Sequence, residues 1–180
     1  MKNSTNSKNT LFVCAGNNEI WDFATPIGIG LVSSAINLTR ILAKNSSYEK
    51  LVFVGTCGLY EKGEILGILE SDNAVNIEIS ALLGLSYSPI VSCETSLINS
   101  SNFITTDRKI ALEFSKRGIL AENMEFYSVC EVAKSFRIPV SGVFCATNFC
   151  DKNAHADFLK NHKKAMEILG NYINENYFRF

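Results

Sequence analysis

The stretch Asn123-Met-Glu-Phe-Tyr-Ser-Val-Cys-Glu-Val-Ala-Lys-Ser-Phe-Arg-Ile-Pro-Val-Ser-Gly-Val-Phe-Cys-Ala-Thr-Asn148 predicts one helix followed by one buried strand. Apolar residues recur in it at helical spacing and should face a core; they are Val129, Val132, Ala133 and Phe136. Pro139 should end the helix, because proline lacks a backbone donor and restricts the residue before it. The run 140–146 is typical of a strand covered on both faces. A carboxylate and an amide thus flank an apolar unit, an arrangement common around active sites of α/β proteins.

Outward from this stretch, strands and helices alternate, which favours a single-domain α/β fold with a central mixed sheet flanked by helices. The expected strands are 10–15, 51–55, 64–69, 74–79, 91–98 and 140–146. The other expected helices are 31–44, a segment from the cap at Asp107 to Arg117, and the amphipathic segment 154–178 with Phe158, Met166, Leu169 and Ile173 inward. A tight turn is expected at 56–58.

Composition narrows the function classes. A chain of 180 residues suits one domain, here 11–180, after a flexible polar leader at 1–10. Its net charge of −1 speaks against nucleic-acid or membrane-surface partners, and no apolar run is long enough to span a bilayer. Six scattered cysteines without a Cys-x-x-Cys pair indicate reduced thiols and a cytoplasmic location. Only two histidines are present, neither at ligand spacing from a cysteine, so no metal site is expected.

Short motifs carry several possible readings. Gly28-Ile-Gly30 lacks the third glycine of a dinucleotide fingerprint, since Ser33 stands there, and close backbone packing is the favoured role. Gly55-Thr-Cys-Gly58 would suit an anion or a sugar oxygen, or form a plain glycine-rich turn. Glu19 and Glu125 lie at element ends, where each is either an exposed surface residue or functional. His155 and His162 are expected to have surface or packing roles.

The order of these motifs resembles the purine nucleoside phosphorylase and nucleosidase superfamily. The most specific match is Met124-Glu125 with its helix, proline and strand, and Gly55-Thr-Cys-Gly58 resembles the turn that meets phosphate or the nucleophile. The resemblance implies a partly closed mixed sheet, a homo-oligomer of two or more chains, and a purine nucleoside as substrate. It implies phosphate as co-substrate and no other cofactor.

The resemblance also implies roles for residues around the sugar and the base. Glu125 resembles the glutamate that holds the ribose hydroxyls, and Met124 the methionine packed under the sugar. A carboxylate suits a vicinal diol, because it accepts from both hydroxyls and favours positive charge developing on the sugar. Phe103, followed by Ile104, resembles the aromatic residue that stacks on the base.

At the nucleophile end, Thr56 resembles the serine of the phosphate or water site, with Gly55, Cys57 and Gly58 around it. Glu19 resembles the glutamate that activates water in the nucleosidase branch. Bacterial hexameric phosphorylases have an arginine three residues before the turn serine, where this chain has Phe53. Arg40, Arg108 or a neighbouring subunit would have to replace it.

Asn148 stands at the position of the aspartate that binds or protonates N7 of the leaving base. Its amide can donate to N7 and to O6, but would meet a 6-amino group with a second donor, so a 6-oxopurine is expected. The resulting expectation is a purine nucleoside phosphorylase, a pentosyltransferase. The alternatives are a hydrolytic nucleosidase that positions water with Glu19, and a non-catalytic nucleoside-binding homologue.

Overall fold

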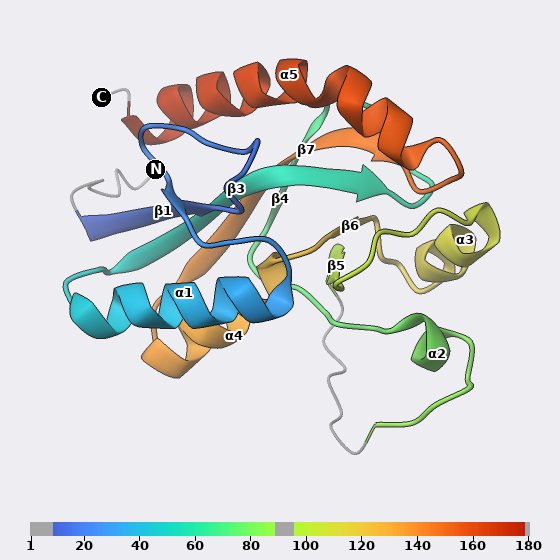
Figure 1. Cartoon of the computed structure of the whole chain (residues 1–180), viewed down its shortest axis with the longest axis horizontal. Coiled ribbons are helices and arrows are strands. Elements are labelled where there is room, and N and C mark those ends of the chain that lie inside the picture. Colours follow the sequence, from blue (N-terminus) through green and yellow to red (C-terminus); the bar gives the residue numbers. More distant parts are fainter. Residues whose placement is uncertain (1–8, 89–95, 179–180) are drawn as a thin grey trace, which may run out of the picture.

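A computed structural model describes residues 9–88 and 96–178. Its strands are β1 (Thr10–Cys14), β2 (Thr25–Pro26), β3 (Lys50–Leu59), β4 (Ile68–Ser71), β5 (Ile98–Ser100), β6 (Ala121–Asn123) and β7 (Val140–Phe149). Its helices are α1 (Leu31–Lys44), α2 (Ile79–Leu82), α3 (Arg108–Lys116), α4 (Phe126–Phe136) and α5 (Ala154–Ile173), which runs into a π-helical turn, Asn174–Phe178 (Figure 1). The expected alternation of strands and helices is confirmed.

Strand β3 is the centre of a seven-stranded mixed sheet. Its first half pairs in parallel with β1, its last two residues pair antiparallel with β6, and β7 runs parallel along its other side. The remaining pairings add β2 to β1, β5 to β6 and β4 to β7. Within the described residues no pairing joins the outer strands, so the sheet is open and the expected partial closure is wrong.

Helices cover both faces of the sheet (Figure 1). Helices α1 and α4 pack together against one face, where Leu38, Phe53 and Phe126 share a core. Helix α5 lies along β7 and β3 on the other face, where Leu169 and Ile173 are buried. Because helices cover both faces of the sheet, β3 and β7 are apolar almost throughout.

The unit formed by α4 and β7 has the predicted form. Val129, Val132 and Ala133 are buried, whereas Phe136, also expected inward, is 37% exposed in the last turn. The helix ends at Arg137 in the left-handed conformation, two residues before Pro139. Strand β7 then extends to Phe149, three residues beyond the predicted end.

The expected tight turn at 56–58 is wrong, because these residues continue β3. Thr56 and Cys57 pair with β7, and Gly58 pairs with β6 on one side and β7 on the other. The register shifts between Cys57 and Gly58, which marks an irregularity in the ladder. The segment Gly55-Thr-Cys-Gly58 is therefore part of β3 and does not end the strand.

Two other strand predictions are also wrong. Residues 64–67 form a turn with Leu66 at positive φ, and the strand starts only at Ile68. Residues 74–79 contain one isolated bridge at Val75, because the Asn99 side chain accepts the N–H of Ile77 in place of a strand partner. The strand expected at 91–98 falls mostly outside the described residues, and β5 begins at Ile98.

The amphipathic pattern of the last helix was only partly correct. Leu169 and Ile173 are buried as expected, but Phe158 and Met166 are only half-buried, and Ala154 and Ala165 complete the buried face. Helix α5 also ends as an α-helix at Ile173, before the predicted limit. None of the helices in the described part of the chain is long and apolar enough to cross a membrane.

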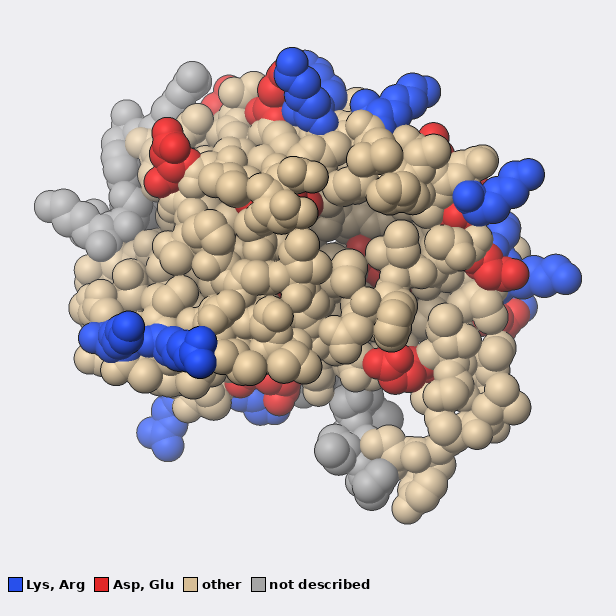
Figure 2. Space-filling model, viewed as in Figure 1, with Lys and Arg blue, Asp and Glu red and all other residues tan. Residues whose placement is uncertain are grey.

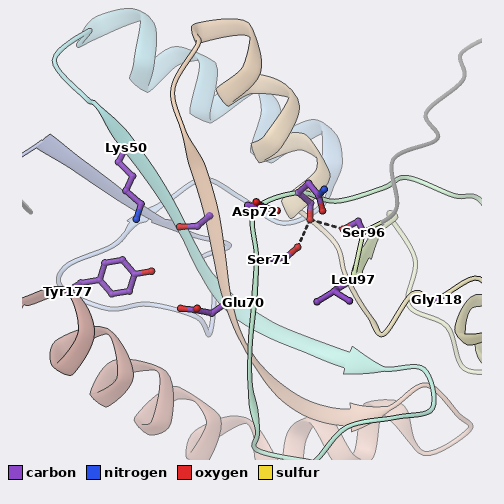
Figure 3. Close-up of a pocket in the computed structure, with 10 residues that line it drawn as sticks. Lys50, Glu70, Ser71, Asp72, Ser96, Leu97, Gly118 and Tyr177 are labelled. Atoms are coloured by element: carbon purple, nitrogen blue, oxygen red, sulfur yellow. Dashed lines mark hydrogen bonds between the residues drawn. The ribbon is translucent and has the colours of Figure 1, made fainter. Parts of the chain in front are cut away.

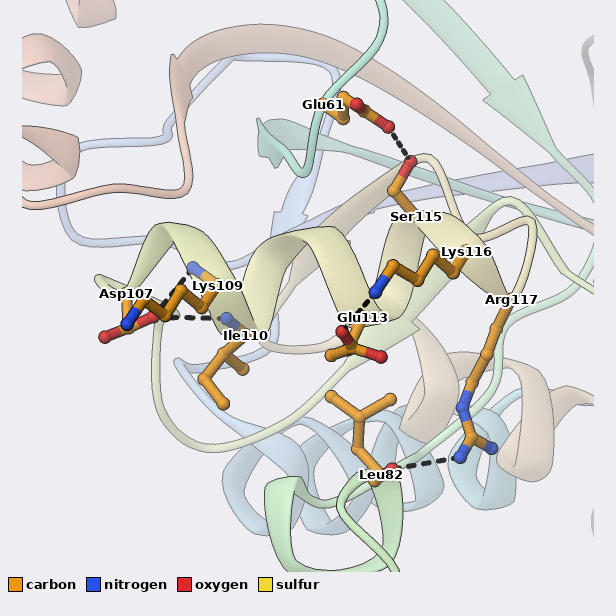
Figure 4. Close-up of polar contacts among 9 residues, drawn as sticks. All are labelled: Glu61, Leu82, Asp107, Lys109, Ile110, Glu113, Ser115, Lys116 and Arg117. Carbon is orange, nitrogen blue, oxygen red and sulfur yellow. Dashed lines mark hydrogen bonds and ion pairs between the residues drawn. The ribbon is translucent and has the colours of Figure 1, made fainter.

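Helix α3 begins as predicted. Asp107 caps it, accepting the N–H groups of Lys109 at 2.7 Å and Ile110 at 3.1 Å (Figure 4). At its other end, Arg117 donates to the carbonyl of Leu82 at 3.0 Å, which ties α3 to α2. These contacts fix the segment that follows Phe103 and Ile104.

The structure describes five of the six cysteines. Cys14, Cys57, Cys130, Cys145 and Cys150 are free thiols, and Cys93 lies outside the described residues. Burial raises the pKa of Cys14 to about 11 and that of Cys130 to about 12, so these thiols are unreactive. Among residues 9–88 and 96–178, no cluster of His, Cys, Asp and Glu could hold a metal ion.

Candidate active site

A cavity of about 370 Å³ opens at the carboxyl ends of β3 and β7. It is lined by every predicted site residue except Gly55: Glu19, Thr56, Cys57, Gly58, Phe103, Ile104, Met124, Glu125 and Asn148. These residues come from five separate parts of the chain, and the sheet brings them together where parallel strands end. We call this cavity the central pocket.

At one end of the central pocket, Glu19 lies over strand β3. Its Oε1 accepts the hydroxyl of Thr56 at 2.5 Å and the Thr56 N–H at 3.2 Å. A Cβ on Gly55 would stand 2.8 Å from the buried ring of Phe53 and 2.9 Å from Glu19 Oε2, so glycine leaves room for both side chains. Burial raises the pKa of Glu19, and the two bonds from Thr56 oppose that rise. The site thus holds a carboxylate with increased basicity.

On the α4 side of the pocket, Glu125 is 6% exposed and held by three N–H donors. Oε1 accepts from Gly30 N at 2.9 Å, and Oε2 accepts from Asn123 Nδ2 at 2.9 Å and Met124 N at 3.2 Å. Gly30 adopts φ of +83°, which favours glycine. A Cβ on Gly28 would stand 3.0 Å from the Cβ of Ser33, so the predicted close packing of this segment is confirmed. A carboxylate accepts about four bonds, which leaves Oε1 one further hydroxyl.

Asn123 explains how the Glu125 side chain is oriented. Its Oδ1 accepts the N–H groups of Glu125 at 3.3 Å and Phe126 at 3.0 Å, as a cap does at the start of a helix. The hydroxyl of Ser100 also donates to this oxygen, at 2.8 Å. Asn123 therefore anchors the backbone before the first turn of α4 through its oxygen while its amide holds the Glu125 carboxylate.

The environment of Glu125 makes stability depend on pH. Burial raises its pKa from 4.5 to about 7, with a contribution from Glu19, while the Gly30 N–H opposes the rise. A raised carboxyl pKa stabilises the fold at low pH, and this contribution is lost as pH rises from about 4.5 through 7. Between pH 6 and pH 8 the loss is about 1.4 kcal/mol, or roughly 3–5 °C in Tm.

Thermal unfolding at pH 6 and pH 8 tests this expectation in the wild type and in a Glu125→Gln variant. Glutamine does not titrate, so the fall in Tm from pH 6 to pH 8 should be smaller in the variant than in the wild type, by roughly 3–5 °C. Glu19, whose pKa is raised in the same direction, leaves a residual fall in both proteins. Equal slopes in the two proteins would contradict the raised pKa of Glu125.

At the opposite end of the pocket, the amide of Asn148 lies over Gly58. Its Oδ1 accepts the Thr147 hydroxyl at 2.9 Å, and Nδ2 donates to the Phe149 carbonyl at 3.1 Å, which leaves one N–H free. A Cβ on Gly58 would stand 2.9 Å from Nδ2, so the strand is bare beneath the amide. Phe103 lines the same pocket and is 80% exposed, with Ile104 beside it.

The charge of the central pocket is distinctive. Three carboxylates line it, from Glu19, Glu122 and Glu125, and no Lys or Arg is among its described lining residues. Figure 2 likewise shows acidic atoms inside a hollow near the centre of this face, with basic side chains around the periphery. Such a lining favours neutral or cationic ligands over polyanions.

The residues considered as replacements for the phosphate arginine lie elsewhere. Phe53 is fully buried between Phe126 and Phe144. Arg40 is exposed on α1, and Arg108 donates to the carbonyl of Tyr60. The N–H and O–H of Thr56, which the resemblance offers to phosphate or water, are both directed at Glu19.

Several lining residues escaped the sequence analysis. Glu122 stands next to the Asn123-Met-Glu motif but was not singled out, although a buried acid directly after the apolar run 119–121 was a usable signal. His155 and Phe158 reach the pocket from the first turns of α5, where helical periodicity predicted only packing. The contact of the Gly30 N–H with Glu125 could not be predicted from the sequence, because the two residues are 95 positions apart.

A second cavity, of about 590 Å³, lies near the amino ends of β3 and β7 (Figure 3). Lys50, Glu70, Asp72, Ser141 and Tyr177 are among its lining residues. None of the predicted site residues contributes to it. The central pocket is therefore the candidate active site.

No family model and no curated protein sequence matches this chain. Solved structures do match. A Helicobacter pylori 5'-methylthioadenosine/S-adenosylhomocysteine nucleosidase, an Asp-to-Asn mutant with 5'-methylthioadenosine in the active site, has a TM-score of 0.76 at 15% identity over 93% of this chain and 96% of that chain. The S-adenosylhomocysteine nucleosidase of Streptococcus pyogenes, in complex with 5-methylthiotubericidin, has a TM-score of 0.73 at 13% identity over 90% and 92%.

Futalosine hydrolase of Helicobacter pylori is also similar, with a TM-score of 0.75 at 15% identity over 92% of this chain and 95% of that chain. These neighbours are nucleosidases and a hydrolase, so the expectation of a phosphorylase, a transferase, is wrong. The physical reason lies in the pocket, where a phosphate dianion would meet three carboxylates and no Lys or Arg among the described lining residues. The chain has the fold of these nucleosidases and of futalosine hydrolase, in agreement with the fold that the resemblance implied.

Proposed function

We propose that this protein hydrolyses the N-glycosidic bond of a purine nucleoside. The observation that carries the proposal is the carboxylate of Glu19, held by Thr56 at the edge of a pocket that also contains Glu125 and Asn148. A carboxylate with a raised pKa is suited to take a proton from water near neutral pH. The fold shared with nucleosidases that hold nucleosides or their analogues supports the same reaction.

In the proposed reaction, the oxygen of a water molecule bonds to C1' of the sugar as the bond from C1' to N9 breaks. The bond's electron pair leaves with the purine, and Glu19 takes a proton from the water. Positive charge develops on the sugar, where Glu125 stabilises it through its negative charge and one hydroxyl contact. The products are free ribose and the purine, which takes up a proton from solvent.

At the base, Asn148 donates its free N–H to N7 as that atom gains electron density. Shared between N7 and position 6, this single N–H favours a carbonyl oxygen over an amino group there, so inosine and guanosine are the proposed substrates. Phe103 stacks on the base, and Met124 packs under the sugar. The exposure of Phe103 leaves its ring face free for such a contact.

Assay of inosine cleavage with and without phosphate tests the reaction class. We expect hypoxanthine and free ribose at the same rate in both conditions, because the described lining of the pocket has no Lys or Arg to neutralise a phosphate dianion. A phosphate-dependent rate with ribose 1-phosphate as product would overturn the proposal.

A second candidate is a protein that binds purine nucleosides without cleaving them. Asn148 favours it, because an amide cannot protonate the base as a carboxylic acid can. One structural neighbour is an Asp-to-Asn mutant with 5'-methylthioadenosine in the active site. Calorimetric binding of inosine without release of hypoxanthine over hours would support this second candidate against the first.

A further inference from the structure

We propose that Trp21 is a positioning residue for the hydrolysis, because it holds the loop that carries Glu19 against helix α5. The inference rests on the proposed function, in which Glu19 takes a proton from water. It adds a residue outside the central pocket, since Trp21 is not among the described residues that line it.

The Glu19 loop, residues 16–24, has little structure of its own. It lies between β1 and β2 and belongs to no named helix or strand. Two backbone hydrogen bonds lie within it: the Glu19 N–H donates to the Gly16 carbonyl at 3.0 Å, and the Ala24 N–H donates to the Trp21 carbonyl at 3.1 Å. A loop with so few bonds of its own holds a carboxylate in place only if contacts from other elements restrain it.

The indole of Trp21 supplies such a contact. Its Nε1 donates to the carbonyl of Met166 in α5 at 3.2 Å, across 145 positions of the sequence. In an α-helix this carbonyl also accepts the N–H of the residue four positions later. Helix α5 therefore does not need the second donor, and the bond serves to attach the loop.

Gly170 leaves space on α5 for the indole. A Cβ on Gly170 would stand 3.5 Å from Nε1 and 3.6 Å from Cδ1 of Trp21, so alanine would fit there and a longer side chain would meet the ring. Glycine is, after proline, the least favourable residue inside a helix. The bare face of the helix thus coincides with the place where the loop is attached. We call the contact of Trp21 with Met166 and Gly170 the clamp.

Aromatic contacts connect the clamp to the sheet. Trp21 stacks on Phe23, with ring centroids 5.9 Å apart and planes at 22°. Phe23 in turn meets Phe12 of β1 edge-on at 5.8 Å and Phe178 of the π-helical turn at 5.6 Å. Such pairs prefer defined ring arrangements, so they restrain the loop as well as bury it. Residues 21–23 are thus attached to β1, to α5 and to the turn that follows α5.

Fixing Trp21 fixes Glu19, because only Ile20 separates them. Glu19 Oε1 meets the two donors of Thr56, at 2.5 Å and 3.2 Å, only while the loop keeps its place. Displacement of a catalytic group by about 1 Å can cost about 10²-fold in rate. Binding of the sugar and the base is assigned to residues on other elements, so loss of the clamp should lower kcat and leave KM nearly unchanged.

The clamp also affects the protonation of Glu19. Burial raises the pKa of Glu19 more than its hydrogen bonds lower it, so release of the loop into water should bring this pKa down toward that of an exposed glutamate. Glu125, Cys14 and Cys57 interact electrostatically with Glu19, and His155 lines the same pocket from α5. These four groups lie outside the Glu19 loop and should stay in place when it is released.

The test measures kcat and KM for inosine in the wild type, Trp21→Ala, Trp21→Phe and Tyr177→Leu. In Trp21→Ala we expect kcat to fall at least about tenfold and KM to change less than about threefold. Trp21→Phe keeps an aromatic ring beside Phe23 and loses the indole N–H, so its kcat should lie between the other two values, and it remains testable if Trp21→Ala is unstable. Tyr177→Leu is the matched control, because Tyr177 packs on Phe12 in the same cluster, with ring centroids 5.5 Å apart. Its kcat should stay near that of the wild type.

A Gly170→Leu variant releases the clamp from the helix side. Leucine forms helices better than glycine, so α5 should not be weakened, while the new side chain meets the indole. Trp21 is the only tryptophan in the chain, so fluorescence reports its release. We expect emission at longer wavelength, stronger quenching by acrylamide and a fall in kcat in this one variant.

Wild-type kcat in Trp21→Ala would overturn the positioning role, as would wild-type kcat in Gly170→Leu with the tryptophan released. An equal fall of kcat in Tyr177→Leu would overturn it too, because the loss would then follow from any weakening of the aromatic cluster.

A readout without turnover separates the clamp from the reaction. If the wild type cleaves no nucleoside, the proposed hydrolysis fails, and NMR titration of the Glu19 carboxyl carbon decides on the clamp alone. Glu19→Gln identifies the resonance by its absence. A lower pKa of Glu19 in Trp21→Ala than in the wild type would support the clamp, and an equal pKa would reject it.

Discussion

Replacement of Glu19 by glutamine is expected to lower kcat for inosine hydrolysis by about 10³-fold, within the range of losses seen when a general base is removed. Glutamine keeps the size of the side chain and can still accept the hydroxyl and N–H of Thr56, so the geometry should persist. What it loses is the ability to take a proton from water. KM for inosine should change little, because the contacts to sugar and base are made by other residues.

Stopped time courses of hypoxanthine release, with inosine affinity measured separately by calorimetry, check this expectation. Glu113→Gln is the matched control, because Glu113 pairs with Lys116 on the exposed face of α3 and is not among the residues that line the pocket. Turnover within a few-fold of wild type in Glu19→Gln would show that Glu19 is not the base that activates water. Loss of inosine binding would instead make Glu19 a substrate contact.

The part of the fold encoded by neighbouring residues was predictable. Apolar spacing in 129–136, Pro139 and the run beginning at Val140 were enough to define α4 and β7. Thr56 to Gly58 could not be assigned correctly, because these residues remain in β3 only through pairing with β6 and β7, more than 60 positions away. Turn-forming composition predicted the wrong local structure where distant strands supply the partners.

The candidate site, like the fold, could be predicted only in part. Motif order brought Glu19, Glu125 and Asn148 into one proposed site, and the structure places all three around one pocket. The nucleophile was misjudged, since the sequence does not reveal that both donors of Thr56 are directed at Glu19. The sequence also does not reveal that the described lining of the pocket lacks Lys and Arg. That property depends on which side chains the fold places away from the pocket.

Glu19 and Glu125, the two carboxylates proposed to act at the sugar, interact electrostatically. Burial and, to a lesser extent, the negative charge of Glu19 raise the pKa of Glu125, so the protonated form of Glu125 is favoured when the pocket is empty. A positively charged sugar between them would favour both ionised forms. The pocket is thus better suited to the charge of an oxocarbenium-like transition state than to a neutral nucleoside, which is the condition for catalysis by differential binding.

Glu125→Ala is therefore the variant with the largest expected loss, about 10³-fold or more in kcat/KM for inosine. Alanine removes the negative charge and the hydroxyl contact, and it leaves the N–H of Gly30 and the amide of Asn123 without their acceptor. Some of the loss could then come from disorder in the first turn of α4. Affinity for ligands separates this structural loss from the loss of charge.

A nucleoside analogue with a cationic pyrrolidine in place of ribose resembles the charged sugar, whereas free hypoxanthine contacts only the base end of the pocket. In Glu125→Ala the affinity for the cationic analogue should fall by at least about 100-fold, and that for hypoxanthine by less than about threefold. Equal losses for the two ligands would assign the defect to a distorted pocket. Near-normal turnover of inosine would remove Glu125 from the mechanism, because a charge that stabilises only the transition state cannot be lost without slowing the reaction.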